Sequence, residues 1–168
     1  MTAEDPLFTW ASDQGLLGLD PEPEPVTPAE HLAVSELLNR YALGYDERRL
    51  DLITSAFTVD AVCETWLRET RVSRFEGAQA ISTEMASVMR EQGPAQRRHL
   101  VTNLIVTRDG DDLRGVAYSA VLLAPGPEEV HVGASAVYDL VATDDAGALR
   151  LSRLTIGLDG YLGHAPRR

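Results

Sequence analysis

The second half of the chain contains four long runs of residues that are typical of β-strands, and this pattern constrains the fold more than any other. The runs cover residues 97–107, 113–123, 130–142 and 149–158 and are rich in Val, Leu, Tyr and Thr. The short segments between them contain Asp-Gly, Pro-Gly and Ala-Gly steps, which favour tight turns. Because a short turn joins antiparallel neighbours, the pattern predicts a meander of four long strands.

The first half of the chain has mainly helical periodicity. A helix is expected to begin at Thr27-Pro28-Ala29-Glu30, because Thr27 can cap it, Pro28 suits the first helical position and Glu30 completes a capping box. Apolar residues at helical spacing give it one buried face, made of Leu37, Leu38, Tyr41, Ala42 and Tyr45. Two shorter helices are expected over residues 50–57 and 78–90, with a strand over 61–67 and an extended piece over 72–75 between them.

Helices first and strands last favour an α+β fold, with three N-terminal helices packed on one face of a curved antiparallel or mixed sheet. The chain has 168 residues, which fits a single domain. Residues 1–26 are rich in proline and acidic residues and are predicted to form an N-terminal extension. The folded domain is expected over residues 27–162, followed by a tail over 163–168.

Charge and residue usage exclude several kinds of partner and mechanism. The formal net charge is −11, from 26 acidic and 15 basic residues, so no nucleic acid or anionic membrane is expected as a partner. No apolar run approaches the roughly 18 residues of a membrane span. The basic residues are all arginine, which excludes Schiff-base catalysis and a P-loop because both need a lysine amine.

Cysteine and histidine usage predicts neither a disulfide nor a metal site. The single cysteine, Cys63, cannot form an internal disulfide, so a reducing cytoplasm is the expected location. The histidines and acidic residues do not have the spacing of metal ligands, so we expect no metal.

One acidic residue lies on the apolar stripe of the first helix. Leu38, Ala42 and Asp46 are spaced by four, which places Asp46 near the end of the buried face. A carboxylate in that position is either half-buried or held by a partner. The alternative is that Asp46 lies beyond the helix and caps the next one.

The first long strand carries two polar residues on one face. Side chains alternate along a strand, so His99 and Asn103 are expected to point the same way. A hairpin closed around Gly110 and Asp111 would place His99 opposite Leu122 and Asn103 opposite Tyr118, whereas a bulge would move Tyr118 to the other face. Counting outward from the turn of the last hairpin in the same way places Tyr138 opposite Arg153. On this pattern alone, His99 is either a structural residue or a catalyst.

Two motifs resemble the SnoaL-like domains of the nuclear transport factor two-like superfamily. The first comprises residues 41–46 (YALGYD), Leu50-Asp51 and residues 57–61 (FTVDA), and the second is the RHLVTN segment over residues 98–103. The resemblance covers roughly residues 30 to 160. It implies a cone-shaped α+β barrel that encloses an apolar pocket, with Asp46 and His99 together inside it and no cofactor.

The resemblance also implies roles for individual residues. His99 would be the general base, and Asp46 would fix its tautomer and stabilise the imidazolium. Tyr45 or Tyr41 would bind or protonate the leaving oxygen. The remaining candidates for substrate binding are Asn103, which could hold a carbonyl, together with Arg153, Tyr118, Tyr138 and Trp66.

The function implied is a cofactor-independent lyase of the dehydratase type. Its substrate would be a small, largely apolar, oxygenated metabolite, and its setting secondary metabolism. Two alternatives remain open at this stage, namely a polyketide cyclase or isomerase with the same dyad, and a non-catalytic ligand-binding or assembly subunit. Apolar residues on the outer strand faces also suggest a homodimer formed through the sheet.

Overall fold

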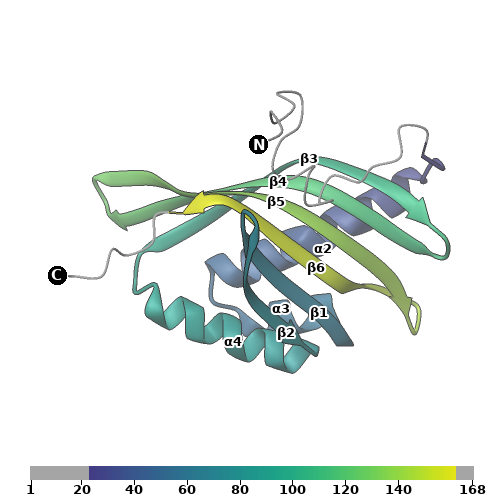
Figure 1. Ribbon diagram of the computed structural model, residues 1–168, viewed down its shortest axis with the longest axis horizontal. Helices are drawn as coiled ribbons and strands as arrows, with labels where there is room; N and C mark the ends of the chain where they lie inside the picture. Colours follow the sequence, from purple (N-terminus) through teal and green to yellow (C-terminus); the bar gives the residue numbers. More distant parts are fainter. Residues whose placement is uncertain (1–22, 162–168) are drawn as a thin grey trace, which may run out of the picture.

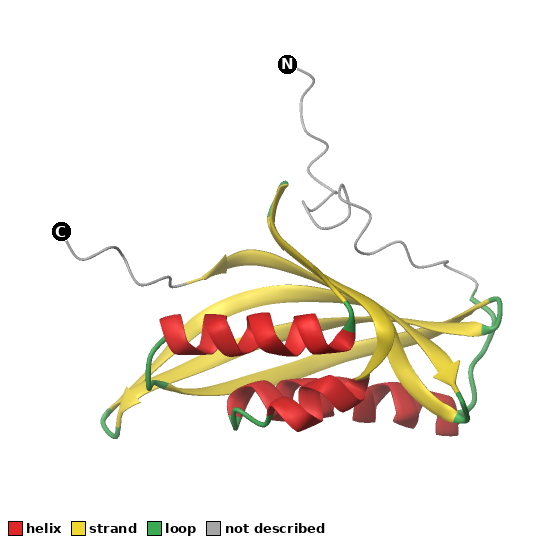
Figure 2. Ribbon diagram, turned by 90° about the horizontal axis from the view of Figure 1, so that it is seen from below, coloured by secondary structure: helices red, strands yellow, loops and turns green. Residues whose placement is uncertain are grey.

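The computed structural model describes residues 23–161, which form three helices packed on one curled six-stranded sheet (Figures 1 and 2). The sheet curls around the helices but does not close, which confirms the predicted α+β class and its cone-like form. Most of the extension predicted for residues 1–26 and the whole tail predicted for residues 163–168 lie outside the described residues.

The long helix α2 (Pro28–Asp46) begins where the sequence predicts. The Thr27 hydroxyl accepts a hydrogen bond from the Glu30 backbone N–H at 3.2 Å, and the Glu30 carboxylate accepts one from the Thr27 backbone N–H at 2.7 Å. These reciprocal bonds form a capping box and satisfy two donors that a helix start otherwise leaves unpaired. The predicted start is therefore confirmed.

A close corner joins α2 to α3 (Leu50–Ala56) and fixes where α2 ends. A Cβ at Gly44 would lie 2.9 Å from Ile53 Cγ1 and 3.1 Å from the Arg49 carbonyl oxygen, so only glycine fits between the two helices. Arg48, in the connection, has a φ of 55°, a conformation that non-glycine residues rarely adopt. The corner ends α2 at Asp46, beside the sheet.

The strands are β1 (Phe57–Leu67), β2 (Thr70–Glu76), β3 (Gln96–Asp109), β4 (Asp112–Gly126), β5 (Glu129–Asp145) and β6 (Ala148–Tyr161). Helix α4 (Ala78–Glu91) connects β2 to β3. The order across the sheet is β2-β1-β6-β5-β4-β3, so the predicted meander forms its larger part. Strand β1 runs parallel to β6 and all other pairs are antiparallel, which makes the sheet mixed.

Strand β1 begins at Phe57, earlier than the predicted start at residue 61. Phe57 already pairs with Leu151 of β6, and the register shifts before Val62 pairs with Arg153. That irregularity interrupts the alternation of buried and exposed side chains on which strand prediction depends.

The register between β3 and β4 differs from the predicted one. Near the turn Ile105 pairs with Val116, as predicted, but a bulge follows and Thr102 pairs with Tyr118. Asn103 lies in this bulge with a φ of 56°. The pairing of Asn103 with Tyr118 and of His99 with Leu122 is therefore wrong by one residue, and His99 lies opposite Val121.

The core lies between the helices and the concave face of the sheet (Figure 2). Its largest fully buried side chains are Tyr41, Leu38, Ile53, Ile81, Leu140, Leu151, Leu154, Val34 and Cys63. Burial raises the pKa of the Cys63 thiol to about 12, which keeps it an inert core residue at neutral pH. No helix among residues 23–161 is long and apolar enough to cross a membrane.

Candidate functional site

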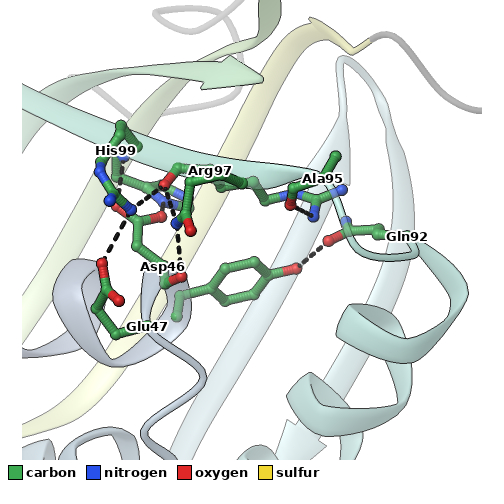
Figure 3. A network of polar contacts seen from close by, with 9 residues as sticks. Asp46, Glu47, Gln92, Ala95, Arg97 and His99 are labelled. Atoms are coloured by element: carbon green, nitrogen blue, oxygen red, sulfur yellow. Dashed lines mark hydrogen bonds and ion pairs between the residues drawn. The ribbon is translucent and has the colours of Figure 1, made fainter. Parts of the chain in front are cut away.

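Asp46 and His99 meet where the end of α2 packs against β3 (Figure 3). The distance between His99 Nδ1 and Asp46 Oδ1 is 2.5 Å. The second carboxylate oxygen, Oδ2, accepts a hydrogen bond from the His99 backbone N–H at 2.7 Å. Both oxygens of Asp46 therefore hold the same residue, which fixes the imidazole ring relative to the strand. Asp46 does not cap α3, whose N-terminus has no side-chain cap.

This contact determines how the histidine ring carries its proton. An ionised carboxylate only accepts hydrogen bonds, so Nδ1 must donate to Asp46. In a neutral imidazole Nε2 then has a free lone pair, and it forms no hydrogen bond with any residue in the described part of the chain. The arrangement leaves Nε2 able to accept a proton from a bound molecule.

The pair is largely removed from solvent. The side chains of His99 and Asp46 are 8% and 6% exposed. The two groups come from the end of a helix and the start of a long strand, so rigid elements position both.

Tyr45 packs directly against the histidine ring. The two ring centroids are 5.2 Å apart at an interplanar angle of 69°. The Tyr45 hydroxyl donates a hydrogen bond to Gln92 Oε1 at 2.8 Å, just after the end of α4. Burial raises the pKa of Tyr45, so its hydroxyl stays protonated at neutral pH and can donate. The predicted neighbours Asp46, His99 and Tyr45 thus lie together.

Tyr41 and Tyr138 lie deeper, in an aromatic cluster of the core. The Tyr41 ring is 6.4 Å from Tyr45, 6.2 Å from Tyr138 and 6.1 Å from Phe57. Both Tyr41 and Tyr138 are 2% exposed, and burial raises the pKa of each well above the usual value of 10. These two residues, both predicted to bind substrate, form the apolar wall behind Tyr45.

Asn103 and Tyr118 do not share a face with His99. In β4 the neighbours Ala117 and Ser119 are buried, with 1% and 4% of their surface exposed, whereas Tyr118 is 46% exposed. The bulge at Asn103 causes this change, because one extra residue in β3 turns the following partners to the other side. The prediction that Asn103 and Tyr118 line the site with His99 is wrong.

Arg153 and Trp66 also lie on the outer face of the sheet. Arg153 Nη2 is 3.5 Å from Asp139 Oδ1, and Asp139 points outward between the buried, inward-facing Tyr138 and Leu140. The Trp66 indole donates a hydrogen bond to Glu64 at 3.3 Å. The guanidinium of Arg71 lies 5.9 Å from the centroid of the Trp66 ring. Neither side chain faces the dyad, because the sheet separates them from it.

Two residues beside the dyad were not among the sequence candidates. The Gln96 side chain donates hydrogen bonds to the backbone carbonyl oxygens of Asp46, at 3.1 Å, and Arg97, at 3.0 Å. Arg97 is half-buried, and its Nη1 donates to the Ala95 carbonyl oxygen at 3.3 Å. The alternation of the strand could have identified Arg97, since it lies two residues before His99 on the same face.

Within the described residues, no group of three or more His, Cys, Asp or Glu side chains is arranged to hold a metal ion.

Comparison with known proteins gives a consistent picture. A family model described as a SnoaL-like domain matches residues 28–155. No curated protein matches the chain. Among solved structures, a protein from Catenulispora acidiphila in complex with S-DNPA is 25% identical, with a TM-score of 0.68, over 79% of this chain and 96% of that one.

Two further structures are similar in fold. ActVI-ORFA from Streptomyces coelicolor is 17% identical with a TM-score of 0.69, covering 78% of this chain and 98% of that one. A type 2 hexachlorocyclohexane dehydrochlorinase is 18% identical with a TM-score of 0.65, covering 83% of this chain and 92% of that one. At these identities the likeness concerns the fold alone.

Proposed function

Because this chain belongs to the SnoaL-like domain family, we propose that it is an enzyme that removes a proton from a small, largely apolar, oxygenated metabolite without a cofactor. His99 is the general base and Asp46 is the residue that holds its ring. The observation that carries the proposal is the 2.5 Å contact between Nδ1 and Oδ1, which directs Nε2 away from the carboxylate.

In the first step, Nε2 of His99 takes a proton from a carbon next to a carbonyl group, and the electrons of the C–H bond move into an enolate. The imidazolium that forms lies against the Asp46 carboxylate, which balances its charge. A positioned base of this kind contributes about 10² to 10⁴ in rate. The apolar surroundings of Tyr41, Tyr45 and Tyr138 would orient the substrate and keep water away.

In the second step, the enolate expels a hydroxyl group from the neighbouring carbon. The C–O bond breaks with its electrons, and the departing oxygen takes the proton held on Nε2 of His99 and leaves as water. Tyr45 is the candidate donor to this oxygen, because its ring packs against His99 and its protonated hydroxyl would exchange the bond that it makes to Gln92. His99 is then neutral again, and the overall reaction is a dehydration.

A cyclase or an isomerase would use the same first step, so both belong to this proposal as variants. They differ from the lyase in the fate of the enolate, which attacks a second carbonyl group in a cyclase and is reprotonated at another carbon in an isomerase. The dehydrochlorinase is an eliminating enzyme by its name, so this fold accommodates an elimination. The relative in complex with S-DNPA supports a small-molecule ligand.

The test uses 4-hydroxy-4-phenylbutan-2-one in deuterium oxide. Deuterium incorporation next to the carbonyl reports proton abstraction, and absorbance of the conjugated enone reports loss of water. Wild type is compared with His99→Gln and with a matched control, Arg98→Gln, which removes a half-exposed charge from the next position of β3.

We expect exchange in wild type and in Arg98→Gln and none above background in His99→Gln. Equal exchange in wild type and His99→Gln would refute His99 as the base. Exchange in none of the three proteins, together with tight binding of the ketone, would favour the non-catalytic ligand-binding subunit instead.

The predicted homodimer and the cytoplasmic setting in secondary metabolism are also part of this proposal. Support for a dimer comes from Leu100, Ile105 and Tyr118, which are 48%, 49% and 46% exposed on the outer face of β3 and β4. Sedimentation of the wild type and of Ile105→Asp would test it. A single monomeric species for the wild type at micromolar concentration would contradict it.

A further inference from the structure

Two arginines beside the dyad have no acidic partner. Arg97 donates to the Ala95 carbonyl oxygen, and Arg48 Nη2 donates to the Gly93 carbonyl oxygen at 2.6 Å. Neither forms an ion pair with a carboxylate of the described residues, whereas most other arginines there do, as Arg40, Arg49, Arg71, Arg74, Arg98, Arg108, Arg114, Arg150 and Arg153 illustrate. In a chain with 26 acidic and 15 basic residues, unpaired arginines are unexpected.

The position of Arg97 relates it to the catalytic pair. Arg97 and His99 alternate with the exposed Arg98 along β3, so their side chains leave the same face of the strand. Figure 3 shows Arg97 extending along the strand toward Ala95 and Gln92, away from His99. Two residues of a strand span roughly 6.5 Å between their Cα atoms, and the Arg97 side chain extends further in the direction away from His99.

The two guanidinium groups bond to carbonyl oxygens two residues apart, those of Gly93 and Ala95. Burial lowers the pKa of Arg97, the charge of Arg48 lowers it further, and Tyr45 and Asp46 act in the opposite direction. Arg48 also has the unusual φ of 55°, and strained backbone of this kind is common at binding sites. Two guanidinium groups without an ion-paired carboxylate are stabilised when an anion binds between them.

We infer that Arg97, assisted by Arg48, binds a carboxylate group of the substrate, further along β3 from His99. This inference rests on the proposed function, since it specifies the substrate of the same site. The guanidinium fork matches a planar carboxylate, and the aromatic residues beside it suit an apolar chain between the carboxylate and the reacting carbon. The substrate class is therefore a hydroxy- or oxo-carboxylic acid with an apolar body.

The test measures binding and does not need turnover. Sodium 4-phenylbutanoate and its neutral amide, 4-phenylbutanamide, are titrated into wild type, Arg97→Gln, Arg97→Lys and the control Arg98→Gln, with ¹H–¹⁵N spectra as the readout. We expect wild type and Arg98→Gln to bind the acid about tenfold more tightly than the amide. Arg97→Gln should lose this preference, and Arg97→Lys should keep part of it.

Equal binding of acid and amide to the wild type, no binding of the acid at 10 mM, or a preference that survives in Arg97→Gln would each overturn the inference. Unfolding curves of the variants exclude a loss of fold as the cause. Because His99→Gln should still bind the acid, failure of the proton-abstraction proposal and failure of the carboxylate subsite give different results.

Discussion

The molecule buries two carboxylates on opposite faces of the same sheet. The side chain of Asp46 is 6% exposed and that of Asp139 is 5% exposed. Asp46 binds the ring and the backbone N–H of His99. Asp139 instead lies between two arginines, with Arg114 Nη2 at 2.5 Å and Arg153 Nη2 at 3.5 Å. The two carboxylates are therefore equally buried but have different partners, a histidine for Asp46 and two arginines for Asp139.

The partners decide what each carboxylate can do. Burial raises the pKa of Asp139, and Arg114 and Arg153 oppose that effect. Arginine keeps its proton at any physiological pH, so the outer cluster can join strands β4, β5 and β6 but cannot accept a proton. A histidine can change its charge near neutral pH, so only the inner pair has the chemistry of a base.

The largest effect is expected from His99→Gln. The amide keeps a polar group of similar size but cannot accept a proton as a base. Turnover of a substrate should fall by about 10² to 10⁴ while the free energy of unfolding changes little. Steady-state rates and chemical denaturation measure the two quantities, and near-full activity would contradict the assignment.

A direct comparison comes from making the same substitution at both carboxylates. Asp46→Asn presents an amide where His99 needs an acceptor, and it should reduce kcat by a factor of about 10 to 10³ by disturbing the tautomer. Asp139→Asn should leave kcat within a factor of about two, because the sheet separates it from the dyad. Similar kcat losses in both variants would remove the distinction drawn between the two sites.

Removal of the outer carboxylate should affect stability instead. Asp139→Ala leaves the guanidinium of Arg114 without its acceptor, at a site where that side chain is 23% exposed. Since part of the charge is screened by solvent, the expected loss is about 1–3 kcal/mol of unfolding free energy. Urea denaturation measures it, and an unchanged midpoint would indicate that the cluster has no structural role.

A third carboxylate, Glu30, extends the comparison to the helix start, where it bonds to Thr27 and Arg108. The Thr27 backbone N–H and Arg108 lower the pKa of Glu30 from 4.5 to about 2. A carboxylate with a lowered pKa stabilises the folded state at pH values above its ordinary pKa, and this stabilisation is lost as the pH falls toward 2. The stability difference between wild type and Glu30→Gln should therefore be constant above pH 5 and shrink in acid. A difference that grows in acid would contradict the sign.

The sequence predicted much of the fold because its signals are local. The capping box at Thr27, the turns between long strands and the apolar face of α2 each depend on neighbouring residues. Resemblance to a known family brought together Asp46 and His99, which are far apart in the chain. Both kinds of information are independent of the exact strand register.

The remaining site residues depended on register and were misplaced for that reason. A single bulge at Asn103, with its positive φ, turned Tyr118 outward. Arg153 found a buried acidic partner in Asp139 on the outer face, a pairing across strands that no local pattern encodes. Arg97 was not predicted although alternation places it on the face of His99, because the sequence does not reveal that this arginine lacks an acidic partner.

The most direct test is the tautomer of His99, read from the ¹⁵N chemical shifts of its imidazole in wild type and Asp46→Asn. His99→Gln identifies the signals among those of the four histidines. We expect the proton of the neutral ring to lie on Nδ1 in the wild type, with Nε2 bare, and a mixture of tautomers in Asp46→Asn. A wild-type ring protonated at Nε2, or the same spectrum in both proteins, would contradict the role given to the Asp46–His99 pair.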